Sequence, residues 1–277
     1  MSDTVLLDES NTPLDLRLSG DELAATREHL AEFIGDQVES AGLDGAVLGL
    51  SGGIDSTTVA YLAVEALGAD AVHGLVMPGE VNTEGNMSDA ERVAADLGIE
   101  FDVIEIEPIA EAFYDAVPEA TDDRMAASNV RVRVRAVLNY FLANAENRLV
   151  LGTGNRSEAL AGYFTKYGDG AVDCHPIGNL YKQQVRQLAD DLGVPRDLVM
   201  KTPSAEMWEG QTDEEELGLT YDTLDAILAL HVDGPLSTSA TVEHLGVPES
   251  AVERVDELYE SSRHKRATPP APKELRL

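Results

Sequence analysis

The sequence predicts an α/β fold: a doubly wound, mostly parallel sheet with helices on both faces, followed by a helical C-terminal part. Two observations lead to this prediction. Short apolar runs alternate with longer segments of helical pattern, and glycines end those helical segments. A glycine-rich turn also follows the first apolar run directly, at the position where open α/β sheets bind their ligands.

The elements of the sheet are expected in the first half of the chain. A helix is expected to begin near Ser19, where a capping serine and the acidic residues after it mark a helix start. It is expected to run to about Ala41. A β-α-β-α-β alternation follows, with strands at Ala46–Leu50, Val72–Met77 and Phe101–Ile106 and helices at Thr57–Leu67 and Met87–Leu97. Such alternation is typical of parallel strands joined by crossover helices.

The second half begins with a long helix expected at Met125–Ala145. A fourth strand at Arg148–Leu151 ends in a Gly-Thr-Gly turn, and another helix follows at Leu180–Leu192. The remainder is predicted to be helical, and the proline-rich stretch Thr268–Pro272 is predicted to lie extended on the surface. No linker or repeat interrupts the chain, so residues 1–277 are predicted to form a single domain.

The charge balance excludes several classes of partner. The chain has 51 acidic and 20 basic residues, a formal net charge of −31 at pH 7, which repels nucleic acids and anionic membranes. This surface is typical of proteins from a high-salt cytoplasm, where ions screen the self-repulsion. The N-terminus lacks signal-peptide features and no apolar run could span a bilayer, so we expect a cytoplasmic protein. The single cysteine, Cys174, is expected to be a small buried hydrophobe.

The turn after the first strand carries the first chemical signal. Its sequence is Ser51-Gly52-Gly53-Ile54-Asp55-Ser56. Adjacent glycines let several backbone N–H groups face one anion, while the serine hydroxyls and the next helix N-terminus add donors and positive potential. Asp55 suits a phosphate site only if Mg²⁺ lies between the two groups. The turn therefore predicts a pyrophosphate cradle with a built-in metal ligand; the structural alternative is a tight turn with a capping serine.

This turn is neither a Walker A loop, because no Gly-Lys-Ser/Thr follows, nor a dinucleotide fingerprint, because the G-x-G-x-x-G spacing is absent. It resembles the loop of the ATP pyrophosphatases, which cleave ATP to AMP and pyrophosphate while adenylating an acceptor. The loop alone leaves the acceptor open.

Motifs further along the chain narrow the choice. They are the segments Ser128–Arg135, Gly152–Glu158, Phe164–Gly170, Asn179–Lys182 and His264–Arg266. Together with the glycine turn, this series resembles the ammonia-dependent NAD synthetase family, from about Leu23 to Arg266. The FTKYGDG stretch is the most discriminating part. The resemblance implies an adenine nucleotide alpha hydrolase-like fold and the conversion of deamido-NAD, ATP and ammonia to NAD, AMP and pyrophosphate.

The resemblance also implies roles for individual residues. ATP would be held by Gly49, Leu50, Ser51, Gly52, Gly53, Ile54, Asp55, Ser56, Thr153, Lys182 and Ser204. Deamido-NAD would be contacted by Arg133, Lys166, Asp173, His264 and Lys265. Asp55 and Glu158 would bind Mg²⁺, and the substrate would lie at a homodimer interface. The chain departs from some family members, which have GTDHAAE where this one has GTGNRSE, so Asn155 and Arg156 are expected to contact ligand differently. Ser204 replaces the usual threonine and keeps its hydroxyl.

The chemistry requires activation of a carboxylate, whose own leaving group would be oxide. Attack on the α-phosphate gives an acyl adenylate, and Mg²⁺ and Lys182 would neutralise charge on the departing pyrophosphate. Ammonia then attacks the acyl carbon. Because ammonium predominates at neutral pH, a carboxylate should attract the cation and help to remove its proton, and Asp169 is our candidate.

Alternative interpretations remain at this stage. Glu158 would also be favourable simply as a carboxylate near a helix start, and isolated lysines such as Lys166 and Lys182 are ordinarily solvated. Another ATP pyrophosphatase is one rival, although a tRNA-thiolating enzyme normally needs several cysteines and a GMP-synthetase-like aminase would lack the FTKYGDG segment. A non-catalytic nucleotide-binding module is the second rival, but it has no need for two magnesium carboxylates.

Overall fold

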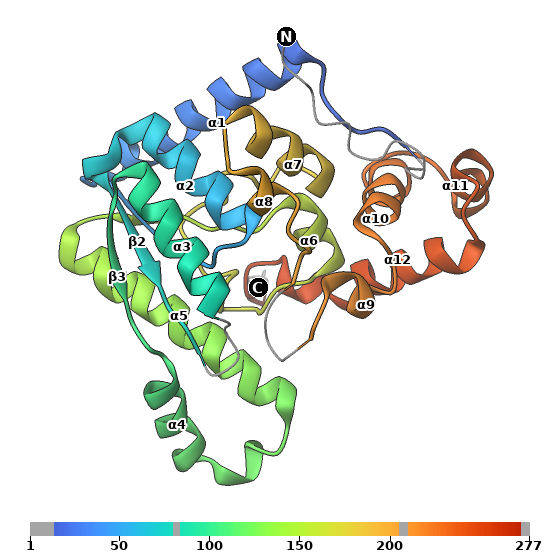
Figure 1. Cartoon of the computed structure of the whole chain (residues 1–277). Coiled ribbons are helices and arrows are strands. Elements are labelled where there is room, and N and C mark those ends of the chain that lie inside the picture. The colour runs from blue at the N-terminus through green and yellow to red at the C-terminus, as the bar shows by residue number, and fades with distance from the viewer. Residues whose placement is uncertain (1–13, 80–83, 205–209, 273–277) are drawn as a thin grey trace, which may run out of the picture.

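The computed structural model of the chain describes residues 14–79, 84–204 and 210–272 (Figure 1). Its sheet has four parallel strands in the order β3-β2-β1-β4. The strands are β1 (Ala46–Leu50), β2 (Val72–Val76), β3 (Glu100–Val103) and β4 (Leu149–Val150). The chain moves outward from β1 through β2 to β3 and then returns to the other side of β1 with β4. The predicted doubly wound parallel sheet is therefore confirmed, and the order of strands reverses between β1 and β4.

Successive residues of a strand point to opposite faces of the sheet. Both faces carry buried apolar side chains, and helices cover both of them. On one face, Ala46, Leu48 and Leu50 belong to a core shared with α1 (Gly20–Ala41), α2 (Ile54–Leu67), α3 (Glu84–Leu97), α7 (Lys182–Asp191) and α8 (Arg196–Val199). On the other face, Val47 and Leu75 pack with α4 (Glu107–Ala116) and α5 (Arg124–Glu146). Val47, Leu48 and Leu75 are completely buried, which contributes about 1.5–3 kcal/mol for each side chain.

The C-terminal helices have a core of their own, which includes Leu217, Tyr221, Leu224 and Val252. They are α6 (Arg156–Ala161), α9 (Asp213–Leu217), α10 (Tyr221–Ile227), α11 (Thr238–Leu245) and α12 (Glu249–Ser261). Short helical turns lie at Ala69–Ala71, Pro118–Ala120, Leu228–Val232 and Arg263–Lys265. The predicted helical C-terminal part is thus confirmed, and residues 268–272 are exposed without helix or strand, as expected.

Several predicted boundaries were wrong by up to three residues, and two of them have a clear local cause. The helix expected from Thr57 begins at Ile54, because Gly53 adopts an extended conformation and its carbonyl accepts the first helical hydrogen bond from Thr57. Asp55 consequently lies in the first turn of α2. The strand expected to reach Ile106 ends at Val103, because Ile106 is already the N-cap of α4, which begins at Glu107.

Within the three described ranges, no helix is both long and apolar enough to cross a membrane. Cys174 is partly buried and packs against the larger core. Burial, with help from the charge of Asp173, raises the pKa of Cys174 to about 11, so this thiol is a weak nucleophile at neutral pH.

Candidate active site

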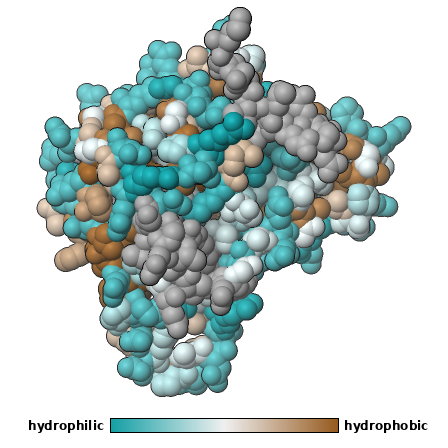
Figure 2. Space-filling model, in the orientation of Figure 1, coloured by the Kyte–Doolittle hydropathy of each residue, from teal (hydrophilic) through white to brown (hydrophobic). Residues whose placement is uncertain are grey.

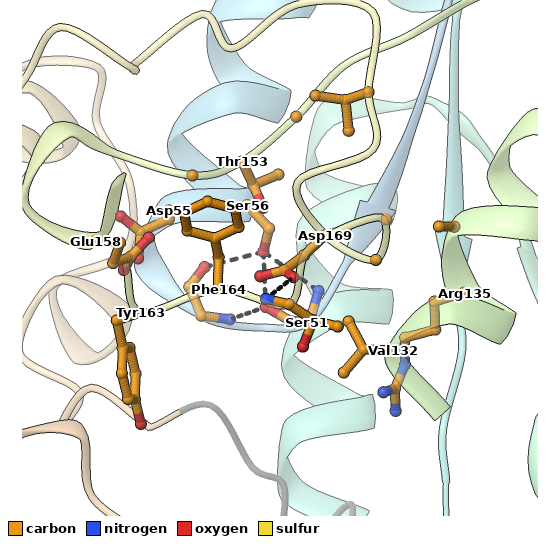
Figure 3. Close-up of a pocket in the computed structure, with 18 of the residues that line it drawn as sticks. Ser51, Asp55, Ser56, Val132, Arg135, Thr153, Glu158, Tyr163, Phe164 and Asp169 are labelled. Atoms are coloured by element: carbon orange, nitrogen blue, oxygen red, sulfur yellow. Dashed lines mark hydrogen bonds between the residues drawn. The ribbon is translucent and has the colours of Figure 1, made fainter. Parts of the chain in front are cut away.

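A pocket of about 640 Å³ opens at the carboxyl ends of β1 and β4, where the strand order reverses. Its lining includes the glycine turn, residues 151–154 after β4, the segment 162–169 and the loop at 201–204. Segments far apart in the chain therefore meet at the edge where open α/β sheets bind ligands. Figure 3 shows side chains from the turn, from α6 and from the 160s segment reaching into this space.

The glycine turn is internally braced. Gly52 has a φ of 73°, a left-handed conformation that favours glycine. The Ser56 hydroxyl accepts a hydrogen bond from the backbone N–H of Ser51 at 3.2 Å and lies 3.0 Å from the Ser51 hydroxyl. Ser56 is almost completely buried, so it supports the turn from within, whereas Ser51 is exposed to the pocket.

The N-terminus of α2 has unpaired backbone N–H groups at the place where the sequence predicts an anion site. The first-turn N–H groups of Ile54, Asp55 and Ser56 have no intrahelical acceptor, and no acceptor for them occurs among the described residues. These groups lie at the positive end of a 14-residue helix, beside the pocket. The turn therefore has the donors needed to bind a phosphate.

Lys182 lies at the centre of the polar side of the pocket, at the first position of α7. Its Nζ donates to Oδ2 of Asp55 at 2.5 Å and to Oε1 of Glu158 at 3.2 Å. The Lys182 side chain is almost completely buried, and its Nζ lies 5.0 Å from the centre of the Tyr221 ring. Figure 3 shows the two carboxylates close together on one side of the pocket.

Two charged groups of this cluster have displaced pKa values. Burial raises the pKa of Glu158 to about 7, with Lys182 opposing the rise and Asp55 adding to it. Burial alone would lower the pKa of Lys182, but Asp55 and Glu158 raise it above its ordinary value. The lysine therefore stays charged, and one cation balances two carboxylates that repel each other.

Asn155 and Arg156 have structural partners. Asn155 is completely buried, and its side-chain amide donates to Oδ1 of Asp55 at 2.9 Å. It also caps α6 reciprocally with Glu158. Asn155 thus orients both carboxylates, whereas Arg156 pairs with Asp233 and is not part of the pocket lining. The expected change in ligand contact at these two positions receives no support from the described side chains.

The positions assigned to deamido-NAD are partly brought together. Nζ of Lys166 donates to the carbonyl of His264 at 2.7 Å, and a guanidinium nitrogen of Arg133 donates to the carbonyl of Lys166 at 3.1 Å. Nζ of Lys265 donates to the carbonyls of Gly162 and Phe164 at 2.7 and 2.8 Å. The 160s segment and the C-terminal HKR segment therefore form one wall of the pocket.

Asp173 lies outside this group. Its carboxylate accepts hydrogen bonds from the backbone N–H of Val150 at 2.8 Å and from the Tyr140 hydroxyl at 3.0 Å, and it is not part of the pocket lining. Its predicted contact with substrate stays a prediction that this pocket alone does not support. The other ATP-site predictions, Thr153 and Ser204, both line the pocket, and the Ser204 hydroxyl donates to the carbonyl of Gln211.

Asp169 faces the pocket near the glycine turn (Figure 3). Its Oδ1 accepts a hydrogen bond from the backbone N–H of Thr165 at 2.7 Å, which fixes its orientation. Although the carboxylate is open to the pocket, protein surrounds the pocket closely. The resulting desolvation raises the pKa of Asp169 to about 6, against the opposing effect of the backbone hydrogen bond from Thr165.

Two groups in and beside the pocket were not predicted from the sequence. Lys201 lines the pocket beside the glycine turn. The chain has only five lysines, and this rarity could have indicated a role in binding an anion. The polar run Gln211–Tyr221 was also passed over. In the structure, Tyr221 donates to Asp213 at 2.9 Å, and its ring lies against the ammonium of Lys182. Gln211 and Tyr163 both donate to Glu216 in the same run. A dense series of polar residues in an otherwise helical region could have indicated that role.

Comparisons with known proteins identify the family of the chain. The NAD synthase family model matches residues 26–269. The chain is 63% identical over 261 residues to an NH(3)-dependent NAD(+) synthetase of Halobacterium salinarum, covering 94% of this chain and 97% of the relative. Among solved structures, NMN synthetase from Francisella tularensis has a TM-score of 0.80 at 36% identity, covering 91% of this chain and 99% of the other. An NH3-dependent NAD synthetase from Campylobacter jejuni, in complex with the nitrate ion, has a TM-score of 0.75 at 30% identity with the same coverage. The chain belongs to the NAD synthase family.

Proposed function

We propose that this protein amidates deamido-NAD with ammonia, consuming ATP and releasing NAD, AMP and pyrophosphate. The observation that carries the proposal is the arrangement of the pocket. A phosphate-binding turn with a buried lysine–carboxylate cluster lies on one side, and a wall built from the 160s and HKR segments lies on the other. Relatives named NH(3)-dependent NAD(+) synthetase support the same assignment.

The residues divide between two steps. In the first, an oxygen of the nicotinate carboxylate attacks the α-phosphorus of ATP, the bond to the bridging oxygen breaks, and pyrophosphate leaves with the electron pair. The N–H groups of α2 would hold the phosphates, and Lys182 would donate to the oxygens that gain charge. In the second, ammonia attacks the acyl carbon and AMP leaves.

We propose that Asp55 and Glu158 hold Mg²⁺ together with phosphate oxygens of ATP. Hard carboxylate oxygens suit this ion, which is usually bound through one or two carboxylates plus phosphates and water. The residues fit, because both carboxylates already face one shared positive charge, the ammonium of Lys182. Within the described ranges, no group of three or more His, Cys, Asp or Glu side chains could hold a metal by itself. When bound, the ion would supply charge neutralisation on the triphosphate.

We propose that Asp169 attracts the ammonium ion and accepts its proton. The group combines three properties that support this role: a fixed orientation, access to the pocket, and a pKa of about 6. A base of that pKa is ionised at neutral pH and is still basic enough to compete for a proton.

We also propose a homodimer that completes the substrate site. Arg133, Val137 and Phe141 are spaced four residues apart on α5 and therefore share one face of the helix. Val137 and Phe141 are 66% and 74% exposed, while Arg133 lines the pocket. The apolar face is thus continuous with the site. Figure 2 shows brown atoms gathered in the region of β3 and α5, on a surface that is otherwise mostly teal. We also propose, from the acidic composition, that the protein works in a high-salt cytoplasm.

The test is an assay with purified protein, ATP, deamido-NAD and ammonium, in which NAD and AMP are both measured. Equal amounts of the two products, dependent on all three substrates, are expected. Release of ADP, or AMP formation that does not require deamido-NAD, would contradict the proposal. Nicotinic acid mononucleotide belongs in a parallel assay, because one structural neighbour is titled NMN synthetase; preference for it would reassign the substrate.

A further inference from the structure

Lys201 occupies a position that the reaction outlined above does not use. It follows α8 and lies in the loop at 201–204, one wall of the pocket. Its Nζ donates to the carbonyl oxygen of Gly52 at 3.1 Å and to Oδ2 of Asp89, on α3, at 2.8 Å. The ammonium therefore contacts the glycine turn itself, and the side chain is about one quarter exposed (27%).

The charge balance near the turn favours a second cation beside Lys182. ATP brings a triphosphate of about four negative charges to a place where Lys182 is already outnumbered by Asp55 and Glu158. A single Mg²⁺ leaves part of that charge uncompensated. The other lysines of the lining, Lys166 and Lys265, donate to backbone carbonyls of the opposite wall. Lys201 contacts the backbone of the phosphate-binding turn, at the carbonyl of Gly52, whereas Lys182 contacts the side chain of Asp55.

We propose that Lys201 is a second cationic ligand of the ATP triphosphate, bound to the phosphates that leave as pyrophosphate. On ATP binding, its ammonium exchanges the carboxylate of Asp89 for a phosphate oxygen. When the bond between the α-phosphorus and the bridging oxygen breaks, that oxygen takes the electron pair, and an N–H of Lys201 donates a hydrogen bond to the departing group. The reaction step rests on the proposed function, but the binding of ATP by Lys201 does not.

Asp89 separates this role from a purely structural one. If Lys201 serves the phosphates, Asp89 competes with them, and Asp89→Asn frees the ammonium without removing its charge. If Lys201 only clamps the turn to α3, Asp89→Asn breaks the same clamp as removal of the lysine. The two interpretations therefore predict opposite results for one variant.

The experiment measures dissociation constants by calorimetry for Mg-ATP, AMP and inorganic pyrophosphate at one fixed ionic strength, without deamido-NAD. Lys201→Met is expected to weaken ATP and pyrophosphate about tenfold or more, because a charge-assisted hydrogen bond is lost, and to leave AMP within about twofold. Asp89→Asn is expected to bind ATP as tightly as the parent or more tightly. Lys201→Arg keeps a cation and should retain most of the affinity for ATP. Together with unchanged AMP binding in Lys201→Met, this result assigns the weaker ATP binding of Lys201→Met to the missing charge and not to misfolding.

Two results overturn the proposal: unchanged ATP and pyrophosphate affinity in Lys201→Met, or equal weakening in Lys201→Met and Asp89→Asn. Exchange of labelled pyrophosphate into ATP, with deamido-NAD present, then tests the reaction step. If the parent shows no such exchange, the proposed function fails, while the binding measurements still decide whether Lys201 is a triphosphate ligand.

Discussion

Lys182 and Asp55 are 127 residues apart in the sequence, yet Nζ of the lysine lies 2.5 Å from Oδ2 of the aspartate in the pocket. The pair joins the start of α7 to the start of α2, so both helix N-termini face the same space. Because the lysine is buried, its charge must be compensated, and Asp55 shares that role with Glu158. The pocket therefore depends on both residues for its charge and for its shape.

Replacement of Asp55 by asparagine should abolish adenylation and keep the fold. The amide preserves the shape of the side chain but removes one of the two carboxylates proposed to hold Mg²⁺. We expect pyrophosphate exchange to fall by about a hundredfold or more, with a circular dichroism spectrum like that of the parent. Normal turnover would refute the metal role of this residue.

Lys166→Met should raise the KM for deamido-NAD by about tenfold and change the KM for ATP by less than about twofold. The reason is that Lys166 belongs to the wall opposite the glycine turn, where it contacts the carbonyl of His264. Steady-state kinetics with each substrate varied in turn give the comparison, and Lys166→Arg is the matched control. Equal effects on both substrates would count against contact with the dinucleotide.

The use of ammonium should depend on the ionisation of Asp169. Since burial raises the pKa of Asp169 to about 6, the group is a carboxylate above that pH and becomes neutral below it. The kcat/KM for ammonium should therefore drop more steeply below about pH 6 than the fraction of free ammonia alone explains. Asp169→Asn should lose this extra dependence and retain pyrophosphate exchange. An unchanged pH profile in the variant would exclude the proposed role.

Asp225 should make stability depend on pH. Its carboxylate is completely buried, accepts from the Ser157 hydroxyl at 2.5 Å and from the backbone N–H of Gln183 at 3.1 Å, and has a pKa raised by burial to about 6. The folded state holds this proton more tightly than the unfolded state, for which the ordinary value is 3.8. The contribution is therefore fully present below about pH 4 and is lost as the pH rises through 6.

Asp225→Asn removes that titration. The difference in unfolding free energy between parent and variant should be larger at pH 4 than at pH 7.5 by about 2 kcal/mol. Urea titrations at both pH values and one high salt concentration supply the measurement. A difference independent of pH would show that the group is ionised in both states.

Salt should stabilise the folded protein, because the net charge of −31 repels itself. At molar potassium chloride the screening length falls to about 3 Å, and both the unfolding free energy and the activity should rise. Sodium chloride at equal ionic strength should act similarly if screening is the cause. Loss of structure at molar salt would contradict the interpretation of the composition.

Local sequence was sufficient for the sheet and for the phosphate turn. The continuous apolar run Ala46–Leu50 and the adjacent glycines of the turn act over a few residues, so their structure follows from nearby chemistry. The ends of helices and strands were predicted less accurately where the next element of the chain determines them. The strand expected to reach Ile106 ended at Val103, because α4 begins at Glu107 and takes Ile106 as its N-cap.

What the sequence determined by itself was the fold class, the anion-binding turn and the family resemblance, because each is carried by short-range patterns. Only the tertiary structure decided that Lys182 lies between two carboxylates, that Asn155 orients them, and that Lys201 touches the turn. Those contacts join side chains from different elements. Their geometry depends on how helices pack on the sheet, a long-range property that no local pattern specifies.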